Sequence, residues 1–103
     1  MNPVIDNFEK MLAAGQDSAL LRYSLGNAHL DEAPQKAIVH LEKAVLLDAK
    51  YSAAWKLLGK ARASIEDTKG AIDAFETGIA VAEANGDVQA MKEMRVFLKR
   101  LNK

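Results

Sequence analysis

The sequence predicts an all-α fold in which helical hairpins repeat along the chain. Helix-forming Ala, Leu, Lys and Glu dominate the 103 residues, whereas there are only two prolines and six glycines. Apolar residues recur at helical spacing, and no stretch alternates between apolar and polar residues as a strand would. One pattern of small and large apolar residues also occurs twice, 33 to 34 residues apart, and such a period is typical of stacked helical hairpins.

The composition is that of a single-domain globular protein. Apolar residues make up 50% of the chain and charged residues 27%, so residues 1–103 are expected to form one domain. The formal net charge is zero, and hence no global field favours nucleic acid or an anionic membrane as a partner. The chain has no cysteine, no membrane-length apolar run and no signal-peptide pattern, so a cytoplasmic location is the default expectation.

The two terminal helices are marked by start and stop signals. Asn2 followed by Pro3 reads as an N-cap with proline at the first helical position, and Gly15 is a natural stop. These signals predict a helix over residues 3–14. Near the other end, a glycine–aspartate pair stops one helix and caps the next, which predicts a last helix over residues 87–101.

Four helices between them form two hairpins. Ser18 is a start signal for the first, Pro34 opens the second, and Ser52 is a candidate N-cap for the third. With the turns that separate them, these helices define one repeat over residues 18–51 and a second over residues 52–85.

The internal repeat is carried by matched small and large residues. Each hairpin places Leu-Gly in its first helix and a spaced set of Ala, a large apolar residue and a small residue in its second. The first set is Leu25, Gly26, Ala37, Leu41 and Ala44, and the second is Leu58, Gly59, Ala71, Phe75 and Gly78, preceded by Trp55.

This pattern resembles the tetratricopeptide repeat (TPR), a helix–turn–helix of about 34 residues. The resemblance implies an α-α superhelix, a right-handed solenoid of two repeats flanked by one N-terminal and one C-terminal helix. Some positions depart from the motif: Arg22 stands where the motif has Trp, His29 and Arg62 where it has Tyr, and Ala49 where it has the closing Pro.

The repeated residue types have a packing explanation. A side chain at Gly26 or Gly59 would force apart two antiparallel helices that cross closely, while Trp55 and Phe75 would fill the space where the helices diverge. The spacing of the flanks puts the N-terminal helix in the place of a preceding repeat's second helix. The C-terminal helix takes the place of a third repeat's first helix, so that the stack approaches three units.

No pattern of catalytic, cofactor-binding or metal-binding residues stands out. His29 and His40 fall on different helices without a carboxylate at ligand spacing, and two ligands make a poor metal site. We interpret them as a partly packed and a surface histidine. The carboxylates in the turns fit helix capping better than acid–base chemistry. The chain is therefore not expected to be an enzyme or to hold a cofactor or metal.

The resemblance implies a binding face, because TPR proteins usually bind partners in the concave groove lined by the first helix of each repeat. The expected function is that of an adaptor that binds a protein or peptide. Lys56 and Lys60 share a helix face with no acidic residue at the same spacing, which favours an acidic ligand. The groove positions are Tyr23, Asn27, Leu30, Lys56, Lys60, Lys92 and Lys99.

Two other possibilities are a binding site for a peptide's terminal carboxylate and a structural role. Some TPR proteins hold a peptide's terminal carboxylate with a Lys and two Asn in the first two repeats. Asn27 matches one of these, but Tyr23 and Leu57 replace the others, so the full clamp is absent. The alternative function is structural: a homodimer or assembly joined through the terminal helices, with Phe97 and Leu101, or Val4 and Phe8, at the seam.

Overall fold

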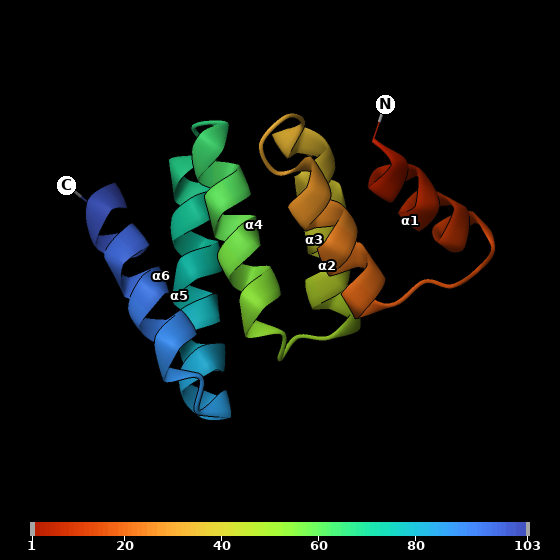
Figure 1. The fold of residues 1–103 in the computed structure, drawn as a ribbon. Helices are drawn as coiled ribbons and strands as arrows, with labels where there is room; N and C mark the ends of the chain where they lie inside the picture. The colour runs from red at the N-terminus through yellow and green to blue at the C-terminus, as the bar shows by residue number, and fades with distance from the viewer. Residues whose placement is uncertain (1, 103) are drawn as a thin grey trace.

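The computed structural model describes residues 2–102, and these residues form six helices and no strand. The helices are α1 (Pro3–Ala13), α2 (Ala19–His29), α3 (Pro34–Leu47), α4 (Ser52–Ser64), α5 (Thr68–Asn85) and α6 (Val88–Leu101). In Figure 1, α2, α4 and α6 lie side by side in one layer, α3 and α5 lie behind them, and α1 stands at the edge beside α2. The predicted six-helix, all-α architecture is confirmed. None of these helices combines the length and the apolar character that crossing a bilayer requires.

Helix starts follow the predicted caps with one exception. The Asn2 carboxamide oxygen accepts a hydrogen bond from the Val4 amide at 2.9 Å, and the Ser18 hydroxyl accepts one from Leu21 at 3.1 Å. Ser52 was expected to cap α4, and that prediction is wrong. Ser52 is the first residue inside α4, and its buried hydroxyl donates to Asp87 Oδ2 at 2.9 Å. Since Asp87 caps α6, this bond ties the starts of α4 and α6 together.

Each hairpin is held by a large side chain that packs directly on a glycine. A Cβ placed on Gly26 would lie 2.5 Å from Cγ of Leu41, and one on Gly59 would lie 2.5 Å from Cε1 of Phe75. Both large side chains are completely buried. The expected close crossing is therefore present. Phe75, however, lies on the glycine itself rather than in a space where the helices diverge.

Trp55 is structural but only partly buried. It packs against the core cluster formed by α3, α4 and α5, and its indole N–H donates to the Ala49 carbonyl at 2.9 Å. Its Cβ also lies close to Gly78, where an added Cβ would come within 2.8 Å of it. The indole thus links the N-terminal turn of α4 to Ala49, the residue that replaces the motif's closing proline.

The two ends of the stack are attached differently. α6 buries Ala90 and Met94 against α5, with Met94 completely inaccessible. α1 has no buried residue and contacts only α2 among the six helices. The two flanking helices therefore sit at the two ends of the stack as expected, but α6 is much more firmly packed than α1.

The contact at Gly59 predicts whether a Gly→Ala substitution raises or lowers the free energy of unfolding. In an open helix, Gly→Ala stabilises by roughly 0.5–1 kcal/mol. For Gly59→Ala we expect the opposite, a loss of roughly 1–3 kcal/mol in the free energy of unfolding, because the new methyl group overlaps the buried Phe75 ring. Urea denaturation followed by circular dichroism measures this. A variant as stable as the parent would contradict the close packing of α4 on α5.

α4 ends in a conformation that suits glycine, yet the residue there is Glu66. Its φ is 64°, and the amides of Glu66 and Asp67 bond back to the carbonyls of Ala63 and Arg62 at 3.0 and 2.9 Å. This is a Schellman ending, in which the left-handed residue is usually glycine. α5 ends in the same way with Gly86, whose φ is 74°.

We therefore expect Glu66→Gly to stabilise the protein by about 0.5–1 kcal/mol, since it removes the left-handed strain of a Cβ-bearing residue. Glu66→Ala is the matched control because it removes the same carboxylate but keeps the Cβ, and it should not stabilise. Thermal melts of the three proteins distinguish the two effects. Equal gains from both substitutions would attribute the effect to charge rather than to backbone strain.

Candidate protein-binding face

Two adjoining hollows lie on the face formed by α2, α4 and α6. One, between α4 and α6, has a volume of about 360 Å³ and an almost wholly apolar interior. The other, of about 310 Å³, lies between α4 and the α2–α3 turn and has mixed polarity. Lys60 and Ser64 line both, so the hollows meet over the C-terminal half of α4. The remaining lining residues are Ala63, Phe75, Phe97, Arg100 and Leu101 in the first and Leu30, Asp31 and Pro34 in the second.

Phe97 organises the hollow between α4 and α6. Its ring stacks on Phe75 with centroids 5.4 Å apart, which joins the hollow to the core. Two cations lie near the same ring: Lys60 Nζ is 5.7 Å and Arg100 Cζ is 5.9 Å from its centroid. Within residues 2–102, neither cation has a carboxylate oxygen within 4.0 Å. The hollow is therefore apolar inside and positively charged at its rim.

Lys56, one helical turn before Lys60, has a different environment. Its ammonium donates to the Glu93 carboxylate of α6 at 3.1 Å. As the sequence indicated, no acidic residue of α4 itself neutralises Lys56; its acidic partner comes from the neighbouring helix. Lys56 joins α4 to α6, whereas Lys60 remains available.

The other predicted groove residues divide into three groups. Tyr23 stacks on Tyr51 with centroids 4.9 Å apart and packs against the core, so it is largely a structural residue. Leu30 lines the second hollow, and Asn27 is exposed on α2. Lys92 and Lys99 are exposed on α6 outside both hollows, and within residues 2–102 no carboxylate pairs with either one.

The groove predicted from the sequence did not include Arg100, and Phe97 and Leu101 were assigned to a self-association seam. The structure shows Phe97 and Leu101 half-buried against the α5–α6 core cluster. Arg100 follows Phe97 by three residues, and this spacing places both on one helix face. The sequence contains this spacing, but only the packing of α4 against α6 brings Lys60 to the same ring.

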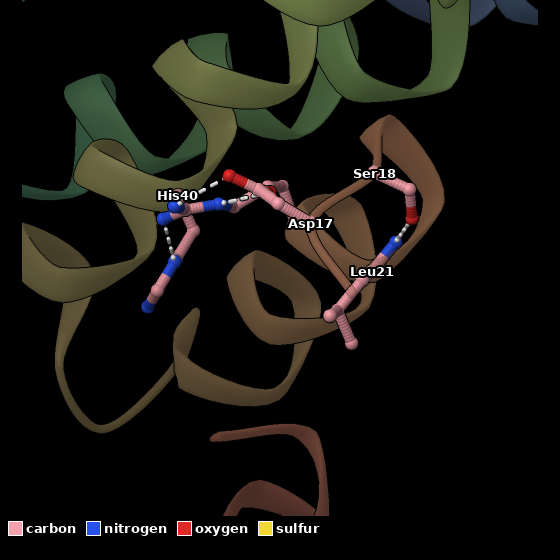
Figure 2. A network of polar contacts seen from close by, with 5 residues as sticks. Asp17, Ser18, Leu21 and His40 are labelled. Carbon is pink, nitrogen blue, oxygen red and sulfur yellow. Dashed lines mark hydrogen bonds and ion pairs between the residues drawn. The ribbon is translucent and has the colours of Figure 1, made fainter. Parts of the chain in front are cut away.

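A polar network occupies the outer side of α2, where the second repeat has Trp55. Arg22 donates to both oxygens of Asp17, at 2.8 and 3.1 Å, and its third nitrogen lies 3.2 Å from His40 Nδ1 (Figure 2). The Arg22 hydrogen bond holds the pKa of the Asp17 carboxyl below its usual range. A bidentate ion pair thus replaces the indole packing that the repeat motif would provide.

The two histidines meet in this region. Their rings stack with centroids 5.8 Å apart, and His40 is half-buried rather than on the surface as predicted. Burial, Arg22 and His29 lower the pKa of His40 in that order of importance. His29 Nε2 is buried, 3.9 Å from the Glu9 carboxylate of α1, and no group among residues 2–102 forms a hydrogen bond with it. No group of three or more metal-ligating side chains occurs in residues 2–102.

Comparison with known sequences identifies close relatives, although no protein-family model matches the chain. A TPR repeat-containing protein of Pseudomonas aeruginosa is 52% identical over 101 residues, which cover 97% of this chain and 96% of the relative. The heat-shock protein cognate co-chaperone sgt12 of Aspergillus fumigatus is 46% identical over 78 residues. That match covers 76% of this chain but only 21% of the co-chaperone.

Solved structures give the same result. The solution structure of a protein from Bordetella parapertussis has a TM-score of 0.85 at 43% identity, covering 99% of this chain and 90% of the other. The crystal structure of the Sgt2 TPR domain from Aspergillus fumigatus has a TM-score of 0.79 at 35% identity, covering 93% and 64%. These similarities confirm the TPR-like fold that the repeat pattern predicted.

The environment of His40 makes stability depend on pH. Its pKa in the folded protein lies below the ordinary value of about 6.5, so the unfolded chain binds a proton more readily. The contribution of neutral His40 is complete above that value and is lost as the pH falls below it. We expect the parent to lose more stability than His40→Gln between about pH 7.5 and 5, because glutamine stays neutral throughout. Parallel stability curves in urea titrations would contradict this account.

Proposed function

This chain belongs to the tetratricopeptide-repeat family, and on that basis we propose that it is an adaptor whose α2–α4–α6 face binds an acidic segment of another protein. TPR domains typically act in protein–protein interaction, and the family is generally non-catalytic. The proposal concerns which face binds and what charge the ligand carries.

One observation carries the proposal. Lys60 lies where the two hollows meet, and within residues 2–102 it has no carboxylate partner, whereas Lys56 one turn away is paired with Glu93. A cation without a partner at the junction of two hollows suits an extended ligand that carries negative charge. Arg100 adds a second positive group at the rim of the larger hollow.

The similarity to a co-chaperone bears on the class of partner. Sgt12 is named as a heat-shock cognate co-chaperone, and its likeness to this chain supports a protein as the partner class. Tyr23 is stacked on Tyr51 and Leu57 is buried in the core, so the ammonium and amide groups that a terminal-carboxylate clamp places at these positions are missing. The proposal therefore does not extend to the chaperone ligands of such clamps.

The test is an NMR titration of isotope-labelled protein with pools of acidic and basic peptides. We expect the acidic pool to shift amides of α2, α4 and α6, and Lys60→Glu to weaken binding by about tenfold, because it exchanges attraction for repulsion. Lys92→Glu is the matched control: it makes the same charge change at an exposed site outside both hollows and should weaken binding far less.

Both variants are first compared with the parent by thermal melting, so that a loss of fold is not mistaken for a loss of binding. Shifts confined to α3 and α5 would overturn the proposal. Acidic-peptide binding that survives Lys60→Glu would overturn it as well.

A further inference from the structure

The hollow between α4 and α6 has a built interior as well as a charged rim. Phe75 is completely buried and forms part of its inner surface, with Phe97 stacked beside it and Ala63 and Leu101 completing the apolar lining. A volume of about 360 Å³ falls within the range of sites that enclose a small ligand or a large side chain. An apolar group entering the hollow would bury the exposed part of the Phe97 ring, which is held in place by its stacking on the buried Phe75.

The rim of this hollow is positively charged, so an anion is favoured close to that apolar group. Lys60 from α4 and Arg100 from α6 lie 5.7 and 5.9 Å from the Phe97 centroid, so two like charges share one ring. Within residues 2–102, no carboxylate lies within 4.0 Å of either. A carboxylate at this rim would contact a cation while leaving the apolar interior free for a hydrocarbon.

Extended peptide geometry can present both groups on one side of a ligand. In an extended chain, residues i and i+2 point to the same side and are about 6.6 Å apart. A large apolar side chain in the hollow would therefore bring an acidic side chain two residues away over Lys60 or Arg100. The hollow also continues across Lys60 and Ser64 into its neighbour, so the ligand's main chain has room to run on over α4.

We propose that the Phe97 hollow binds a bulky apolar side chain within an extended internal segment of a partner protein, with Asp or Glu two residues away held by Lys60 and Arg100. This inference rests on the proposed function and specifies its ligand. The occupant is thus a segment that alternates acidic and apolar residues, and the experiment distinguishes it from a free chain terminus and from a second copy of this protein.

The probe is a short peptide blocked at both ends with the central sequence Glu-Ser-Leu-Ser-Glu, so that the direction of binding is not assumed. Its affinity is measured by NMR titration and compared with the affinities of three altered peptides. Replacing Leu by Ser should weaken binding at least about tenfold, because a buried leucine side chain is lost. Replacing both Glu by Gln should weaken it about threefold to fivefold, with the difference disappearing at high salt. A peptide ending in Leu with a free carboxylate tests the terminal alternative.

Three protein variants locate the contact. Ala63→Leu should fill the hollow and reduce affinity for the leucine peptide at least about fivefold, since Ala63 lines this hollow only. Arg100→Gln should reduce affinity about threefold and remove part of the salt dependence. Lys99→Gln is the matched control, because it removes the neighbouring exposed charge of α6 outside the hollow and should leave affinity unchanged. Melting temperatures establish that each variant is folded.

The outcomes separate this inference from the function on which it rests. Binding to the α2–α4–α6 face that is indifferent to the leucine and to Ala63→Leu would overturn the inference but leave the proposed function intact. Tighter binding of the free-carboxylate peptide would identify a terminal-carboxylate site instead, and a dimer in sedimentation experiments that occludes Phe97 would identify a second copy as the occupant. Failure of every acidic peptide, pooled or single, would overturn both proposals.

Discussion

The packing of one large side chain on one glycine sets the geometry of each hairpin, and through it the geometry of the face formed by α2, α4 and α6. Phe75 of α5 reaches the backbone of α4 because Gly59 has no Cβ, and this contact brings the two helices together. Leu41 and Gly26 do the same for α3 and α2. The Phe75 ring then supports Phe97 of α6 from below. Successive contacts therefore link the core to the surface hollow: Gly59 contacts Phe75, Phe75 stacks on Phe97, and Phe97 lies under Lys60.

The two repeats satisfy the same architectural requirement with different chemistry. Trp55 in the second repeat covers the start of α4 with an indole that is also hydrogen-bonded to Ala49. Arg22, its counterpart, instead forms a bidentate pair with Asp17 and contacts His40. Ion pairs and hydrogen bonds to a histidine depend on charge state whereas apolar packing does not, and His40 with its lowered pKa lies in the first repeat. The loosely attached α1 lies beside this half of the molecule.

Contacts between helices also decide which charges are available to a ligand. Lys56 and Lys60 are one turn apart and chemically identical, yet α6 presents Glu93 to the first and an aromatic ring to the second. An ion pair between helices holds Lys56 to the fold, while the cation–π contact leaves the ammonium of Lys60 able to receive an anion. The same face therefore combines a structural lysine with a lysine suited to binding.

The sequence by itself determined the helices, the repeat and the positions of the packing glycines. Proline, asparagine and glycine set the helix ends through interactions within a few residues. The spacing between Leu25-Gly26 and Leu58-Gly59 equals the repeat length. It also placed Lys60 and Leu30 on the face where the hollows are found. The tertiary structure alone decided that Ser52 bonds to Asp87, that Glu93 neutralises Lys56, and that Arg100 and Lys60 converge on Phe97. Apart from the Arg100–Phe97 contact within α6, these contacts join residues 35 to 37 positions apart that are carried by different parts of the stack. Their partners depend on the rotation and crossing of the helices, which side-chain packing fixes and local sequence signals do not.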